Sequence, residues 1–76
     1  MSHRLNIHIG THFIIMKELC DGIIDLQFKC VADYMDAIKV LKEYQCRYST
    51  FQANEGEYHH IFTNKIGIAT LTKYFN

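Results

Sequence analysis

The stretch from residue 13 to residue 30, FIIMKELCDGIIDLQFKC, contains the feature that decides the fold: two apolar segments joined by Asp21-Gly22. An Asp-Gly pair is typical of a type I′ turn, because both residues tolerate the positive φ that this turn requires. The segments on either side alternate apolar and polar residues, which is the period of a β-strand with one buried face. The sequence therefore predicts a β-hairpin whose two loop residues are Asp21 and Gly22.

This loop also predicts a register, in which Ile15 faces Phe28. One face of the hairpin is then apolar and is expected to join the core; it carries Phe13, Ile15, Leu19, Ile24, Leu26, Phe28 and Cys30. The opposite face is expected to carry Met16, Glu18, Asp25, Gln27 and Lys29. The register has one cost, because it places Glu18 opposite Asp25 and like charges across a strand pair are weakly destabilising.

On both sides of this hairpin the pattern predicts further elements. The alternation already begins at residue 5, and Gly10 is expected to form a bulge or tight bend that divides this run. From Ala32 onward, apolar residues recur every three or four positions, which is the spacing of an amphipathic helix. The helix is expected to bury Met35, Ile38 and Leu41 and to expose Lys39, Lys42 and Glu43.

The last third of the chain predicts a second hairpin, in which residues 47–53 and 58–63 pair about Glu55-Gly56. Its aromatic face is the better core candidate and carries Phe51, Ala53, Tyr58, His60 and Phe62. Its other face carries Tyr48, Thr50, His59 and Ile61. Residues 66–73, rich in Ile and Thr, favour a last strand, and a short C-terminal helix is the alternative.

Together these elements predict one small α+β domain over residues 1–76. Its antiparallel sheet consists of the first hairpin and two or three further strands, and one amphipathic helix packs on one face. The pattern leaves the order of the strands open.

Composition narrows the class of protein. The chain has 76 residues, 49% of them hydrophobic, and eight Lys+Arg balance eight Asp+Glu. This composition argues against a disordered chain, and zero net charge argues against binding driven by phosphate neutralisation. No apolar run approaches the roughly 18 residues of a membrane span, and the first residues do not resemble a signal peptide. We therefore expect a cytoplasmic domain without membrane contact, whose Cys20, Cys30 and Cys46 are reduced and mostly buried.

Neither a metal site nor a catalytic site is expected. In an unbroken strand His8 and His12 lie about 13 Å apart, too far for one zinc ion, and the adjacent His59 and His60 point to opposite faces. The chain contains no nucleophile elbow, no glycine-rich phosphate loop and no Cys-x-x-Cys spacing. We therefore expect no cofactor and no enzymatic activity.

The remaining signal is a surplus of apolar residues on faces that these registers leave outside the core. The candidate interaction surface consists of Ile14, Met16, Tyr48, His59 and Ile61. Exposed apolar surface of this kind indicates a partner. We therefore expect a small non-enzymatic protein that binds another protein and modulates or inhibits it, as phage and mobile-element accessory factors do. A thin core also favours self-association, most simply as a homodimer.

Two alternatives stay open. The first is a module that binds nucleic acid or a nucleotide, with histidines contacting phosphates and bases stacking on Tyr44, Tyr48, Tyr58 and Tyr74. The second is a structural subunit that is stable only within a larger assembly.

Overall fold

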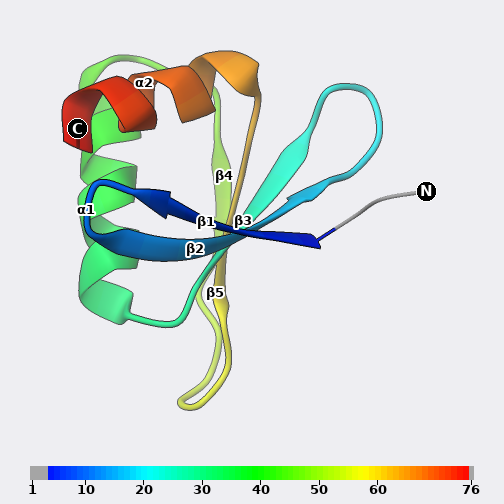
Figure 1. The fold of residues 1–76 in the computed structure, drawn as a ribbon, viewed down its shortest axis with the longest axis vertical. Helices are drawn as coiled ribbons and strands as arrows, with labels where there is room; N and C mark the ends of the chain where they lie inside the picture. Colours follow the sequence, from blue (N-terminus) through cyan, green and yellow to red (C-terminus); the bar gives the residue numbers. More distant parts are fainter. Residues whose placement is uncertain (1–3, 76) are drawn as a thin grey trace.

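Three strands, a helix, two strands and a second helix follow one another along the chain (Figure 1). The computed structural model describes residues 4–75. Its elements are β1 (Arg4–Ile9), β2 (His12–Glu18), β3 (Ile24–Phe28), α1 (Val31–Glu43), β4 (Ser49–Phe51), β5 (His59–Thr63) and α2 (Lys65–Phe75). The five strands form one antiparallel sheet in the order β1-β2-β3-β5-β4. The predicted α+β class is therefore confirmed, and Gly10 does divide the first run into two strands.

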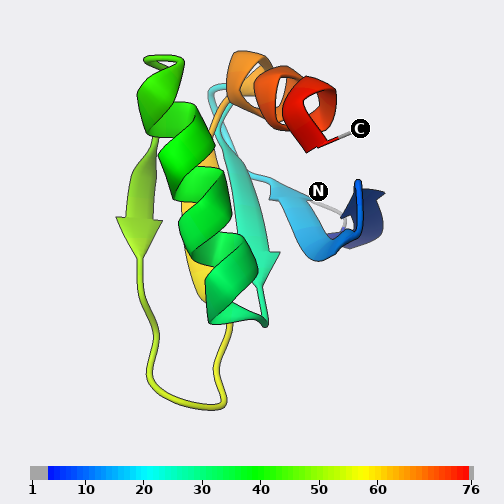
Figure 2. The same ribbon diagram turned by 90° about the vertical axis from the view of Figure 1, so that its left-hand side faces the viewer.

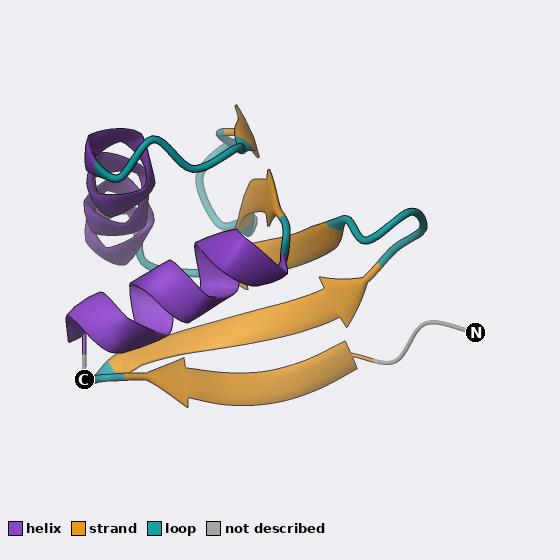
Figure 3. Cartoon of the chain, turned by 90° about the horizontal axis from the view of Figure 1, so that it is seen from above, coloured by secondary structure: helices purple, strands orange, loops and turns teal. Residues whose placement is uncertain are grey.

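Both helices cover the same face of the sheet. Figure 2 shows α1 lying across β3 and β5, and Figure 3 shows α2 lying along the β1–β2 hairpin. Between the helices and the sheet lies the core, whose fully buried large side chains are Ile14, Leu26, Phe28, Tyr34, Leu41, Ile61 and Leu71. The central strand β3 is buried along its whole length. The opposite face of the sheet has no helix on it.

The first hairpin has the predicted turn but a different register. Asp21 and Gly22 have φ values of 56° and 74°, and the Ile23 amide donates to the Cys20 carbonyl at 3.0 Å, as a type I′ turn requires. The Leu19 amide, however, donates to the carbonyl of the same Ile23 at 2.8 Å. Two residues of one strand thus oppose one residue of the other, which is a β-bulge. The predicted pairing of Ile15 with Phe28 is wrong by one residue, since Ile14 pairs with Phe28.

This shift turns every side chain of β2 to the other face, because side chains alternate along a strand. Ile14 faces the helices and is 2% exposed, whereas Phe13 lies on the other face and is 42% exposed. The shift also places Lys17 opposite Asp25, the position that Glu18 was expected to take. An opposite-charge pair thereby replaces a like-charge pair, which favours the observed register. Of the other residues predicted for this core face, Leu19 and Cys30 are exposed.

The second hairpin has the predicted register, with Phe51 opposite His60, but its faces are exchanged. The face with His59 and Ile61 is buried, and the aromatic face with Phe51 is outside. The cause is the pairing of β5 with β3, which sets Ile61 beside Leu26 and therefore under α1. The prediction that the aromatic face forms the core is wrong.

The helices also differ in part from expectation. In α1, Leu41 is buried as predicted, but Ile38 is only half-buried and Met35 is 53% exposed, and Tyr34 takes the place of Met35 in the core. Residues 65–75 form a helix, so the expected last strand is wrong and the alternative is right. The Gly67 amide donates to the Asn64 side chain at 2.9 Å, which caps the helix start.

The three cysteines are free, as expected, but they are not mostly buried. Cys20 and Cys30 are exposed, and Cys46 is half-buried. The expected burial of the first two is therefore wrong.

Replacing Leu41 by Ala should lower the free energy of unfolding by about 2–4 kcal/mol, because it opens a cavity beneath α1. Met35→Ala, on the same helix but exposed, should change it by less than about 0.5 kcal/mol. Urea unfolding followed by circular dichroism measures both. Equal losses for the two variants would contradict the observed phase of the helix.

Two glycines with positive φ allow a second comparison. Gly22 has open space around it, so Gly22→Ala should cost only the left-handed backbone, about 1–2 kcal/mol. A side chain at Gly10 would in addition meet the backbone carbonyl of Phe75 at the end of α2. Gly10→Ala should therefore lower the melting temperature more than Gly22→Ala. A smaller effect at Gly10 would show that α2 does not pack on the β1–β2 turn.

Candidate functional site

The face of the sheet without helices, called the open face below, presents aromatic rings to solvent. Strand register assigns to it Arg4, Asn6, His8, Phe13, Ile15, Lys17, Asp25, Gln27, Ser49, Phe51, His60 and Phe62. Phe51 is 59% exposed and Phe13 is 42% exposed. Ile15 and Phe62 on the same face are half-buried. Two large apolar side chains, Phe13 and Phe51, are therefore exposed to solvent on this face.

At the centre of the open face lies a polar network on the central strand. Asp25 and Gln27 of β3 are each only 6% exposed, although no helix covers them. The His60 Nδ1–H donates to Asp25 Oδ1 at 2.9 Å, and Gln27 Nε2 donates to Asp25 Oδ2 at 3.0 Å. Arg4 Nη2 in turn donates to Gln27 Oε1 at 2.9 Å. Within residues 4–75 no buried side-chain nitrogen or oxygen is left without a partner.

Aromatic rings hold the His60 side chain in this network. Its ring stacks on Phe62 with centroids 5.8 Å apart and planes at 11°, and it meets Phe51 edge-on at 6.0 Å. Because Nδ1 carries the proton that Asp25 accepts, Nε2 is the ring nitrogen that can accept a hydrogen bond from outside. The His60 side chain is 27% exposed. The open face thus presents one oriented polar group among apolar rings.

The open face carries two positive charges, on the exposed Arg4 and the half-buried Lys17, and one negative charge, on Asp25. Arg4 and Lys17 border its centre, whereas its acid, Asp25, is buried and hydrogen-bonded. Lys29 lies just beyond β3, with its ammonium 5.3 Å from the centre of the Tyr58 ring. The zero net charge of the whole chain therefore conceals a local excess of cations.

The residues that the sequence predicted to form an exposed interaction surface are buried or half-buried in the structure. Ile14, His59 and Ile61 are buried beneath the helices, at 2%, 8% and 0% exposure. Met16 and Tyr48 are half-buried and pack against the core. The prediction identified the correct hairpins but the wrong face of each. The single signal that could have corrected it is the charge pairing of Lys17 with Asp25.

The tyrosines expected to stack bases do not form one platform. Tyr44 follows α1 and Tyr74 belongs to α2, where their rings contact each other with centroids 6.3 Å apart. Tyr48 packs against the core, and Tyr58 lies beside Lys29. The rings that share the open sheet surface are phenylalanines, together with His8 and His60.

A second cluster, called the His12 cluster below, lies on the helix side of the molecule. His12 Nε2 is 3.4 Å from Asp33 Oδ1 and 3.9 Å from Asp36 Oδ2. One ligand atom from each of the three residues lies within 4.8 Å of the other two. The spacing of histidines along the sequence does not reveal this cluster. Its histidine begins a strand and its two aspartates lie on a helix about twenty residues later, and only the fold brings them together.

Comparison of the chain with protein-family models, with curated proteins and with solved structures finds no match. Between residues 4 and 75, neither helix has the length and apolar character needed to cross a membrane.

Replacing His60 by Ala should lower the free energy of unfolding by about 1–3 kcal/mol, because the buried Asp25 carboxylate loses a hydrogen bond. Combining His60→Ala with Asp25→Ala should cost less than the sum of the two single changes, because the partners interact. His8→Ala, exposed on the same face, is the control and should have an effect below about 0.5 kcal/mol. Strict additivity in chemical unfolding would contradict the network.

Proposed function

We propose that this protein is a non-enzymatic protein-binding module that attaches to another protein through the open face of its sheet. By occupying a surface of that partner, it modulates or inhibits the partner's activity. The observation that carries this proposal is the aromatic open face built around a hydrogen-bonded polar centre.

The composition of the open face supports a protein partner. The cores of protein interfaces are enriched in aromatic residues and Arg and depleted of Lys, Glu and Asp. Phe13, Phe51 and Phe62 supply the rings, and Arg4 supplies a guanidinium at the margin. Contiguous exposed apolar surface on a small domain is itself an indication of a binding site. The residues that can dominate the binding energy are therefore the rings with the greatest exposure.

The rigidity of this face supports the same proposal. The rings stand on paired strands, and His60 is held by Asp25, Phe51 and Phe62 together. A surface that is already ordered loses little conformational entropy when it binds, and more of its contact energy remains as affinity. Asp25 and Gln27 are hydrogen-bonded to each other, to His60 and to Arg4, so a partner that covers these two side chains leaves neither of them unpaired.

One observation favours a second candidate function. Phenylalanine rings on an open sheet, bordered by Arg4 and Lys17, are also an arrangement that binds single-stranded nucleic acid by stacking and phosphate contacts. This candidate uses the same face but predicts a different salt dependence. Association through phosphates weakens steeply as salt increases, whereas an apolar protein interface responds much less.

The test is affinity capture from a lysate of the source cells with Phe51→Ser and a matched control. Truncation of a central aromatic residue costs about 2 kcal/mol or more, so Phe51→Ser should reduce capture of the partner about thirtyfold. Ile66→Ser, 70% exposed on α2, should leave capture unchanged. Equal capture by both variants would contradict binding through the open face.

The same capture, repeated after nuclease treatment and at raised salt, separates the two candidates. A protein partner should survive both treatments, and loss in both would favour nucleic acid. Light scattering of the isolated chain tests self-association, since a mass near 8.9 kDa means a monomer. A mass near twice that value would mean a homodimer, and Phe51→Ser should then lower the mass toward that of a monomer if the open face is the contact.

A further inference from the structure

We propose that the His12 cluster, formed by His12, Asp33 and Asp36, is a binding site for a divalent transition metal ion of the zinc type. The site lies where the β1–β2 turn meets the first turns of α1. It is on the helix side of the sheet, so it is independent of the open face and of its partner.

The distances within the cluster suit a single ion. Ligand atoms about 2.0–2.2 Å from a tetrahedral zinc ion lie about 3.3–3.6 Å from one another. The separation of His12 Nε2 from Asp33 Oδ1, 3.4 Å, already has this value. The separation from Asp36 Oδ2 is 3.9 Å, and the Asp36 side chain is 61% exposed. All three ligand atoms lie within 4.8 Å of one another, and rotation of the exposed Asp36 side chain can bring its carboxylate closer to the other two.

His12 is oriented as a metal-binding histidine is. Its Nδ1 lies 3.3 Å from the Ile9 carbonyl, and because a carbonyl can only accept, this nitrogen is the donor. A hydrogen bond of this kind to a backbone carbonyl selects the tautomer in metal-ligating histidines and directs Nε2 to the ion. The ring packs against Phe75 with centroids 4.4 Å apart, and the side chain is only 12% exposed. The nitrogen lone pair therefore has a defined direction, toward the two carboxylates.

The charges of the cluster favour a cation at its centre. Two carboxylate oxygens and an imidazole nitrogen converge within 4.8 Å, and all three are acceptors when the imidazole is neutral. Either a proton on Nε2 or a metal ion can satisfy them. A metal ion satisfies all three groups at once, whereas a single proton forms its best hydrogen bond with one carboxylate.

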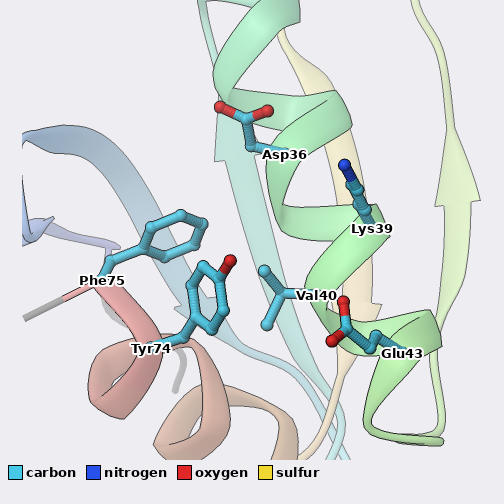
Figure 4. Close-up of a pocket in the computed structure, with 6 residues that line it drawn as sticks. All are labelled: Asp36, Lys39, Val40, Glu43, Tyr74 and Phe75. Carbon is cyan, nitrogen blue, oxygen red and sulfur yellow. The ribbon is translucent and has the colours of Figure 1, made fainter.

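The ligand set indicates which class of ion binds. Calcium and magnesium prefer sites made of oxygen atoms alone, whereas zinc and its neighbours in the first transition series accept imidazole together with carboxylates. One nitrogen and two oxygens from the protein leave at least one coordination position for water or another donor. Asp36 and Phe75 also line a cavity of about 220 Å³ between α1 and α2, shown with its other lining residues in Figure 4. The Asp36 and Asp33 side chains are 61% and 31% exposed, so an ion can reach their carboxylates from solvent.

The experiment is calorimetric titration of the reduced 76-residue chain with ZnCl₂, followed by titration with CoCl₂ monitored by absorption. We expect one ion per chain. Asp36→Asn and His12→Ala should each weaken zinc binding about tenfold or more, since loss of even an outer-shell partner costs about 10–100-fold. Asp36 is exposed, so its variant keeps the fold if His12→Ala does not, and circular dichroism verifies this.

Two matched controls accompany these variants. Glu43→Gln removes a carboxylate from the same cavity but not from the cluster, and His8→Ala removes an exposed imidazole; both should bind zinc as tightly as the parent chain. Bound cobalt should show d–d bands without the thiolate charge-transfer band that coordination by the exposed Cys20 or Cys30 would produce. The proposal is overturned by absence of saturable zinc binding, by unchanged affinity in Asp36→Asn, or by a thiolate band.

Discussion

The register of β2 against β3 is the constraint on which both sites of this protein depend. The bulge at Leu19 and Cys20 sets Ile14 opposite Phe28 and thereby turns the even-numbered side chains of β2 toward the helices. The aromatic ring of Phe13 is left on the open face as a consequence. His12 lies on the helix side for the same reason and can meet α1 there. A shift by one residue would remove Phe13 from the open face and His12 from the two aspartates.

The strand β3 is buried on both faces, and the side chains on its two faces have different roles. Leu26 and Phe28 provide apolar area for α1 to cover. Asp25 and Gln27 occupy a face without a helix, and they are shielded by neighbouring side chains that also satisfy their hydrogen bonds. A buried carboxylate is tolerated only when it is paired in this way. The need to pair Asp25 explains why His60 has a defined orientation at the centre of the proposed binding face.

The two proposed sites occupy opposite sides of the sheet and meet different needs of a small domain. A chain of 76 residues buries only a modest share of its surface, and chains of this size often gain stability from a metal ion or a partner. An ion at the His12 cluster would connect the β1–β2 turn to α1, two elements far apart along the chain. A partner on the open face would cover the rings that the helices leave exposed. Because the two sites share no residue, the stabilisation of the fold by the ion and that by the partner should add.

Local chemistry in the sequence determined the turns, the two hairpins, the extent of α1 and the α+β class. Asp21-Gly22 tolerates positive φ in any context, and the periods of the apolar residues identify strands and a helix without reference to neighbours. Tertiary structure alone decided which face of each hairpin is buried, because the choice depends on a one-residue bulge and on the pairing of β5 with β3. It likewise decided between strand and helix for residues 65–75, since the helix is the form in which Leu71 packs into the core. Neither site could be found beforehand: the contacts of Asp25 with His60 and of His12 with Asp33 join residues far apart in sequence, and only the folded chain brings them within bonding distance.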